Sequence, residues 1–236
     1  NNREFLAIEN QKVYSFELGY GFKSKKFSAN VNGYYTLWRN KPPSYTPTTP
    51  DGDSYNINGL DALHKGVELD FIYKILPNLD FEGLASIGDW KTISGSTANI
   101  VDQDGNILAV VDFSAVNVHV GDAAQIQYGA SLRYEVIKGL YFKLRYTYFG
   151  KNFANFDPTN LVGTNKDRES WQMPNYNLLD FNFGYELKFL KKYKATLNGG
   201  VMNILNTVYI TDAQNGDGFD ASTANVFVGM GRRFNL

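Results

Sequence analysis

The chain has 236 residues, a formal net charge of −1 and no cysteine. It therefore offers no disulfide and no cysteine-ligated zinc, and it lacks the positive surplus that binding to nucleic acid requires. No run of 18 or more apolar residues occurs, which excludes a membrane protein built of helices, whereas the 17 Phe and 16 Tyr exceed the needs of a core and suit the aromatic girdles of a membrane β-barrel.

Long segments in which apolar and polar residues alternate follow one another along the whole chain. Because successive side chains of a strand point to opposite faces, a period of two predicts strands with one apolar and one polar face. Nine segments show it: Val13 to Lys23, Phe27 to Leu37, Lys65 to Lys74, Leu79 to Trp90, Gln125 to Ile137, Phe142 to Tyr148, Leu179 to Lys188, Tyr193 to Leu205 and Ala224 to Phe234. Many reach the roughly ten residues that a tilted strand needs to cross a bilayer, whereas strands of soluble proteins average about 5 to 6. We expect an all-β fold in which about nine long strands form an antiparallel transmembrane β-barrel wall.

The connections between these segments are alternately short and long. Short turns follow segments one, three, five and seven, at Lys23 to Lys26, Leu76 to Asn78, Lys138 to Gly139 and Lys191 to Lys192. Long loops follow segments two, four, six and eight, at Asn40 to Lys65, Lys91 to Ala124, Lys151 to Tyr176 and Thr207 to Thr223. Short periplasmic turns and long extracellular loops are typical of bacterial outer-membrane barrels, so the pattern predicts that location.

The alternation of short turns and long loops also predicts how the strands are oriented in the membrane. With the short turns in the periplasm, the last segment descends, Leu236 is periplasmic and Asn1 to Lys12 lie outside the cell. A complete single-chain bacterial barrel has an even number of strands. Since nine is odd, we expect residues 1–236 to be the C-terminal part of a larger barrel, with the earlier strands outside this segment.

Charged residues recur on the polar side of the segments: Glu17, Glu68, Asp70, Arg133, Glu135, Lys143, Arg145 and Glu186. An ionised group in a dry core costs several kcal/mol unless it is paired. We therefore expect the polar face to look into a wet or plugged barrel interior.

The long loops contain three acidic clusters: Asp51 to Asp53, Asp102 to Asn106 and Asp212 to Asp220. Alternating acidic residues before a glycine can supply oxygen ligands to calcium, but none of the clusters has the full calcium-loop spacing with its distal Glu. We favour turns, for which Asp, Asn and Gly are suited, over calcium, and we expect no cofactor. The Asp-Gly step between two apolar runs at 100–111 also predicts a hairpin outside the membrane.

Seven aromatic residues in or beside the loops are candidates for stacking on a ligand: Trp38, Tyr45, Tyr55, Trp90, Phe153, Phe156 and Trp171. The alternative, which we favour, is that they anchor the upper aromatic girdle or clamp the loops together. The two histidines, His64 and His119, show no ligand spacing, and we assign them to loops or to the wall. Carboxylate pairs such as Glu68 and Asp70 recur in the wall without marking one site, so we expect no catalytic residue and no enzyme.

Four stretches resemble TonB-dependent outer-membrane receptors. Gly200 to Tyr209 is similar to their V-x-N-L-F-N-x-x-Y stretch, with Ile-Leu in place of the usual Leu-Phe, and Gly229 to Phe234 to their closing strand. Tyr14 to Tyr20 resembles their Y-E-x-G wall strand, and Gly66 to Asp70 the G-x-E strand that follows it. The resemblance runs in order over the whole chain and implies nine strands of a 22-stranded barrel with a plugged interior.

The resemblance implies a receptor that imports a scarce, bulky nutrient of the ferric siderophore, cobalamin or glycan class, with energy relayed by the TonB protein. It places the plug, the earlier strands and the energy-coupling segment before Asn1. Asn203, Asn206 and Tyr209 carry over as wall residues, and Phe234 as a signal for the barrel-assembly machinery, although two more residues follow it. Outer-membrane lipid and a surface lipoprotein are the other partners that it suggests.

Two further classes stay open. A passive porin-type channel would have a complete barrel without a plug, so the sequence that precedes this segment would distinguish it from a receptor. A soluble β-sandwich that binds carbohydrate would pack its apolar faces against each other and would stay monodisperse without detergent.

Overall fold

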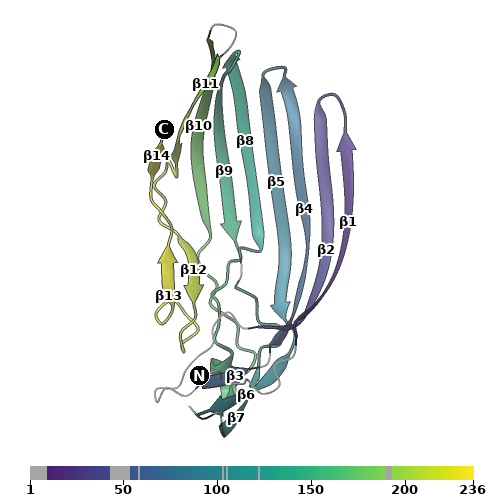
Figure 1. The fold of residues 1–236 in the computed structure, drawn as a ribbon, viewed down its shortest axis with the longest axis vertical. Coiled ribbons are helices and arrows are strands. Elements are labelled where there is room, and N and C mark those ends of the chain that lie inside the picture. The colour runs from purple at the N-terminus through teal and green to yellow at the C-terminus, as the bar shows by residue number, and fades with distance from the viewer. Residues whose placement is uncertain are drawn as a thin grey trace.

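The computed structural model describes residues 10–42, 54–57, 59–102, 104, 106–121, 123–189 and 193–236. Its main element is a nine-stranded antiparallel sheet that forms one curved, twisted wall (Figure 1). In spatial order the strands are β1 (Lys12–Lys23), β2 (Phe27–Lys41), β4 (Leu60–Leu76), β5 (Leu79–Thr92), β8 (Ile126–Ile137), β9 (Leu140–Gly150), β10 (Tyr176–Phe189), β11 (Tyr193–Met202) and β14 (Arg233–Asn235). Within the described ranges, no helix is long and apolar enough to cross a membrane.

The smaller elements all lie in the long connections, at the end of the wall that we call the loop end (Figure 1). A three-stranded sheet combines β3 (Ser54–Ile57), β6 (Gly95–Val101) and β7 (Ile107–Ser114), and a two-stranded sheet combines β12 (Ile210–Gln214) and β13 (Asn225–Val228). Two short 3-10 helices, η1 (Pro158–Asn160) and η2 (Gly163–Asn165), follow β9. The hairpin predicted at 100–111 is confirmed by the pairing of β6 with β7. The other end of the wall is the turn end, where short turns join β1 to β2, β4 to β5 and β8 to β9, and where β10 ends and β11 begins.

The first seven predicted strands are confirmed with small changes of boundary, but the ninth is wrong as a single strand. The segment 224–234 divides into β13, which pairs with β12, and β14, which forms only three residue pairs with β11. The eighth strand ends at Met202 rather than Leu205, because Asn203 and Asn206 take positive φ angles of 51° and 53°. The Asn203 side chain fixes this turn by donating from Nδ2 to the Thr207 carbonyl at 2.9 Å and accepting from the Thr207 N–H at 2.9 Å.

The strand register carries one apolar face across the whole wall. The row Tyr73, Phe81, Leu132, Leu144, Phe181 and Val201 joins residues that are paired from β4 to β11. Several of these side chains are exposed, for example 44% of Leu144, and the ring contacts of this face, such as Phe142 with Phe181, are made within the sheet. The apolar face is therefore open to its surroundings, and a β-sandwich, which would bury it against a second sheet, does not describe this architecture.

Charged residues bound the apolar face at the loop end. On β5 the residues of this face from Leu79 to Ile87 carry no charge, and the next one is Asp89, whose Oδ2 lies 3.3 Å from Lys65 Nζ of β4. Eight residue steps of about 3.3 Å, tilted by about 40°, cover about 20 Å of depth, close to the ~25 Å apolar band of an outer-membrane barrel. Rings gather at the turn end of the band, where Phe27 lies 6.2 Å from Phe22 and 6.0 Å from Phe71. The apolar face thus has the dimensions of a lipid contact.

The polar face holds the predicted charges, and several of them are paired. Glu82 of β5 forms an ion pair with Lys143 of β9 and accepts a hydrogen bond of 2.9 Å from Ser131 Oγ. The Arg133 guanidinium lies 4.3 Å from the centre of the Tyr141 ring. This arrangement suits a wet or plugged interior and not a hydrocarbon core.

The hydrophobic core lies among the loops and not in the wall. One cluster of buried residues comprises Leu60, Ala98, Phe113, Ala115, Val118, Leu161 and Phe219, and a second comprises Ala154, Met173 and Ala213. These residues come from four different connections or strand ends. The loops therefore form a packed cap over one end of the wall.

Candidate ligand-binding site at the loop end

Three aromatic side chains from adjacent strands line the polar face just below the loops. The Trp38 ring of β2 lies 6.1 Å from the His64 ring of β4, and His64 stacks on Trp90 of β5 at 5.2 Å with an interplanar angle of 15°. We call Trp38, His64 and Trp90 the ring ladder. Its residues share the face of Glu68, opposite to the apolar girdle, so the girdle interpretation does not hold for Trp38 and Trp90.

Tyr34 extends the ring ladder toward the turn end. Trp90 Nε1 donates a hydrogen bond of 2.8 Å to the Tyr34 hydroxyl. Two glycines make room for these rings: a Cβ on Gly66 would lie 2.4 Å from the Tyr34 hydroxyl, and one on Gly88 would lie 2.7 Å from Trp90 Nε1. The Tyr34 and Trp90 rings therefore lie close to bare backbone, and the rings of Tyr34, Trp38, His64 and Trp90 are all half-buried.

An irregularity in β2 brings a cation to the same place. Trp38 pairs with Ala62 but Lys41 pairs with Leu60, so β2 has one extra residue here, and Asn40 takes a positive φ of 55°. Such a β-bulge re-aims the residues that follow it. Lys41 consequently shares the polar face with Trp38, and its Nζ lies 5.9 Å from the centre of the Trp38 ring.

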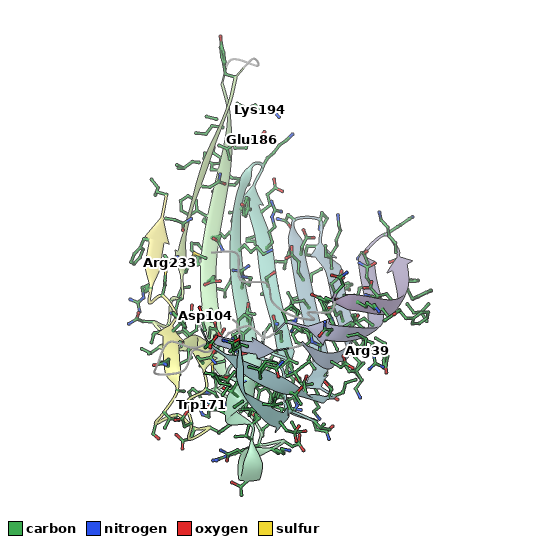
Figure 2. The ribbon with its side chains drawn as sticks, turned by 60° about the horizontal axis from the view of Figure 1, so that its bottom comes forward. Arg39, Asp104, Trp171, Glu186, Lys194 and Arg233 are labelled. Carbon is green, nitrogen blue, oxygen red and sulfur yellow. The ribbon has the colours of Figure 1, made fainter. Side chains whose placement is uncertain are left out.

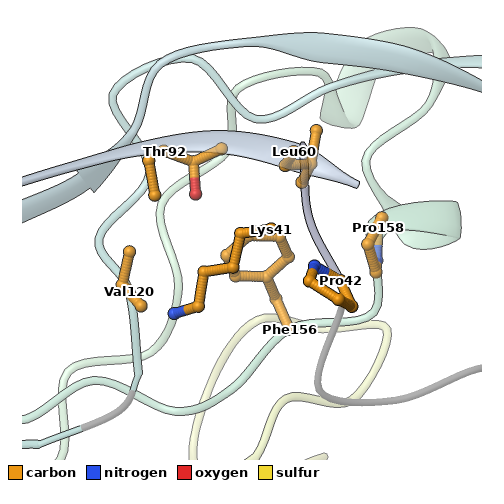
Figure 3. Close-up of a pocket in the computed structure, with 8 residues that line it drawn as sticks. Lys41, Pro42, Leu60, Thr92, Val120, Phe156 and Pro158 are labelled. Atoms are coloured by element: carbon orange, nitrogen blue, oxygen red, sulfur yellow. The ribbon is translucent and has the colours of Figure 1, made fainter. Parts of the chain in front are cut away.

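Lys41 also lines a small cavity between the wall and the loops. The other lining residues are Pro42, Leu60, Ala62, Thr92, Val120, Phe156 and Pro158. In Figure 3 the Lys41 side chain crosses this cavity toward Val120, with Pro42 and Phe156 beside it. Its volume of about 50 Å³ admits water or one small group of a ligand but not a whole nutrient molecule.

The other predicted ring residues hold loops together. Phe153 is 3% exposed and stacks on His119 at 4.1 Å, Phe156 packs on the first core cluster, and Trp171 packs on the second. Figure 2 shows Trp171 among the loops, toward the end of the wall opposite to Glu186 and Lys194. For these three residues the structure favours the interpretation that they clamp the loops.

Two predicted ring residues cannot be assigned to either role. Tyr45 lies outside the described residues, and for Tyr55 the structure describes only the backbone, which belongs to β3. The segment Asn1 to Lys12, which we expect outside the cell, is described only from Asn10.

His119 connects two loops to the wall. Its Nδ1 lies 2.6 Å from Glu169 Oε2, its Nε2 lies 3.7 Å from Asp89 Oδ1, and its backbone N–H donates to Glu169 Oε1 at 3.0 Å. Asp89 is itself 3.3 Å from both Lys65 and Lys91. This network is a structural tie at the edge of the apolar face, where we predicted an ordinary loop or wall histidine.

The acidic clusters within the described residues act as turn formers. Asp102 Oδ1 accepts from the backbone N–H groups of Asp104 at 2.9 Å and Asn106 at 2.8 Å. In the third cluster, Asp220 accepts from the Ser222 N–H at 2.9 Å and from its hydroxyl at 2.6 Å. Among the described residues, no group of three His, Cys, Asp or Glu is placed to hold a metal ion. The first cluster, Asp51 to Asp53, lies outside the described residues.

Two loop carboxylates have shifted pKa values of opposite sign. Burial raises the pKa of Asp157 above its ordinary value, which the hydrogen bonds from Thr159 offset only in part, and nearby Asp217 adds to the rise. Hydrogen bonds from Ser222 lower the pKa of Asp220, and Arg168 contributes to that shift. Asp157 caps η1 through its side chain. Because the carboxylate is partly removed from water there, its ionised form is less stable than it would be in solvent.

Sequence reasoning found Trp38 and Trp90 but missed His64 and Tyr34 as members of the same surface. Tyr34 lies at an alternate position of a predicted strand, so parity alone could have placed it on the polar face. His64 lies in β4, which begins at Leu60, whereas we predicted a strand only from Lys65, so His64 fell in the predicted loop. Their contacts depend on the register between strands, which parity does not give.

One protein-family model, described as TonB dependent receptor-like, beta-barrel, matches residues 5–204. A comparison with curated proteins finds no match.

Several solved structures share the fold. The ferric yersiniabactin uptake receptor FyuA from Yersinia pestis has a TM-score of 0.61 at 15% identity over 95% of this chain and 29% of its own. The copper transporter OprC has a TM-score of 0.66 at 16% identity over 98% of this chain and 31% of its own. The FrpB iron transporter from Neisseria meningitidis has a TM-score of 0.60 at 15% identity over 95% and 30%. The chain thus spans under a third of the length of these structures, and at such identities the likeness concerns the fold alone.

Proposed function

The chain belongs to the TonB-dependent receptor-like β-barrel family, and on this premise we propose that it is part of an outer-membrane receptor that imports a scarce, bulky nutrient with energy relayed by TonB. The family is one of transport proteins and not a class of enzymes. The observation that carries the proposal is the wall itself, in which one apolar and one polar face run unbroken from β1 to β11.

The structure supports the proposal in two further ways. The paired charges of the polar face, such as Glu82 with Lys143, suit an interior that holds water or a plug. The packed loop cap at one end of the wall offers a rigid surface on which a ligand can bind before import.

The orientation and the missing parts belong to the same proposal. We take the loop end as extracellular and the turn end, with the C-terminal residue Leu236, as periplasmic. The plug, the remaining wall strands and the segment that contacts TonB would be supplied by sequence before Asn1.

We propose ferric siderophores, cobalamin and glycans as the candidate nutrient classes. The proposed partners are TonB, outer-membrane lipid, the barrel-assembly machinery and a surface lipoprotein. Phe234 suits an assembly signal, because it pairs with Val201 on the apolar face and is 76% exposed.

The test uses the full-length protein in its own outer membrane. Uptake of labelled candidate nutrients is measured in cells with and without the receptor, and again after removal of TonB. We expect uptake to require both proteins. Uptake that persists without TonB, together with a steady ionic conductance of the purified protein in planar bilayers, would instead identify a passive channel.

A further inference from the structure

We propose that the ring ladder of Trp38, His64 and Trp90 binds an uncharged carbohydrate by stacking sugar rings on its aromatic faces. This inference rests on the proposed function, because it names the class of nutrient that the receptor takes. Sugar rings combine apolar C–H faces with polar edges, so they need flat aromatic surfaces beside hydrogen-bonding groups.

The strand register and the ring contacts place the aromatic side chains of the ring ladder in one row. His64 and Trp90 are a cross-strand pair with nearly parallel rings, at 15°, and Trp38 continues the row from the next strand. Tyr34 is held beside them by the hydrogen bond from Trp90 Nε1, over Gly66 and Gly88. The result is a row of rings that lies across three strands at the entrance to the polar face.

Polar groups flank these rings. Glu17 is paired with Tyr34 in the register of β1 and β2, and Glu68 follows Gly66 by two residues on the same face; both residues are exposed. These two exposed carboxylates accept hydrogen bonds, and they are the groups that hydroxyls of a sugar would contact.

The charge around the ladder argues against a strongly anionic ligand. On the polar face of β1, β2 and β4 the nearest charged residues toward the turn end are acidic: Glu17, Glu68 and Asp70. Lys41, beside Trp38, is the nearest cation toward the loops. An anion seated on the rings would meet more negative than positive charge, whereas a neutral polyol would not be penalised.

The experiment measures binding of neutral oligosaccharides to the purified full-length receptor in detergent by calorimetry. The probes are maltoheptaose, cellohexaose, mannohexaose and xylohexaose, with ferric citrate as an anionic comparison. We expect at least one neutral oligosaccharide to bind, with an affinity that is unchanged between low and high salt, because a neutral ligand is not screened.

Variants locate the binding site. Trp38→Ala and Trp90→Ala should each weaken oligosaccharide binding by about tenfold or more, and Trp90→Phe should retain part of it. Tyr128→Ala is the matched control, because it removes a stacked ring from the apolar face of β8, and it should leave affinity unchanged. The heat-dependent migration of each variant on gels verifies folding.

Two results would overturn the inference: no neutral oligosaccharide of the panel binds, or one binds equally well to folded Trp38→Ala and Trp90→Ala. Either result leaves TonB-dependent uptake intact, because that proposal is tested separately in cells. Loss of TonB dependence with oligosaccharide binding preserved would overturn the proposed function alone.

Discussion

Arg145 of β9 and Asp180 of β10 form an ion pair across two adjacent strands of the polar face, with Arg145 Nη2 2.7 Å from Asp180 Oδ2. The second oxygen of Asp180 accepts the Asn203 N–H at 2.8 Å, at the point where β11 ends. The buried Asp180 carboxylate thus joins β9 and β10 to the turn at Asn203, which ends β11.

The substitution Asp180→Ala should destabilise the barrel by about 1 to 2 kcal/mol, because it leaves the Asn203 N–H and the Arg145 guanidinium without their acceptor. The estimate is modest because the Arg145 side chain is 48% exposed. Urea unfolding in detergent measures the free energy. Glu186→Ala is the control on the same strand, since its pair with Lys194 is longer, at 3.7 Å, and more exposed; an equal loss in both variants would contradict the role of Asp180.

A second prediction concerns the backbone beneath the rings. Gly66→Ala should destabilise the wall by about 1 to 3 kcal/mol, because the new methyl group would lie 2.4 Å from the Tyr34 hydroxyl and 2.6 Å from the Ile87 carbonyl oxygen. Gly33→Ala, where the nearest atoms are 4.0 Å away, should have little effect. The same urea unfolding compares the two variants, and an equal loss of stability in both would show that Tyr34 does not pack closely against Gly66.

The loop cap should respond to pH through Asp157. Because its pKa is raised by burial in the folded protein, the folded state holds this proton more tightly than the unfolded state. The free energy of local opening should therefore rise as the pH falls from neutral through the raised pKa, and level off below the ordinary value of about 3.9. Hydrogen exchange of residues 153–165 between pH 7 and pH 4 measures it, after correction for the intrinsic exchange rate.

Two variants test that assignment. Asp157→Asn can still accept the hydrogen bonds of Thr159 at η1 and should remove the pH dependence. Asp220→Asn should remove a dependence of the opposite sign at residues 216–224, since the Ser222 hydrogen bonds lower the pKa of Asp220 and their stabilisation is lost as the pH falls. Unchanged pH dependence in Asp157→Asn would contradict the assignment.

The two faces of β9 should differ sharply in their tolerance of charge. Leu144 lies on the apolar face and Thr147 on the polar face. Leu144→Lys should cost about 2 to 4 kcal/mol in a bilayer, whereas Thr147→Lys should cost much less. Tryptophan fluorescence during folding into lipid vesicles measures the loss of folding free energy in each variant. Equal losses would show that the two faces of β9 are not in different environments.

The wall could be predicted from the sequence because its information is local. A period of two across ten residues sets the strand and its faces, and short turns such as Lys138 to Gly139 set the hairpins. The interruption of the ninth segment was not predictable in this way, because β13 shows the same alternation but pairs with β12 instead of β11.

The ring ladder shows where local information ends. The turn at Pro77 and Asn78 pairs Leu76 of β4 with Leu79 of β5. If this register continued along both strands without a shift, His64 would lie opposite Lys91. An irregularity between Lys74 and Leu76 shifts the register by one residue, so His64 faces Trp90. The contact of Trp38 with His64 further requires the register of β2 with β4, which is set across a long loop and has no local signal.

The central claim is that the apolar face of this wall contacts lipid while the polar face looks inward. Its most direct test places a bimane fluorophore on single cysteines of the full-length protein in vesicles that contain brominated lipid, at Val67, Leu144 and Leu197 on the apolar face and at Glu68, Thr147 and Asn198 on the polar face. We predict strong quenching at the first three positions and little at the other three. Equal quenching on both faces, or quenching confined to the polar face, would contradict the account.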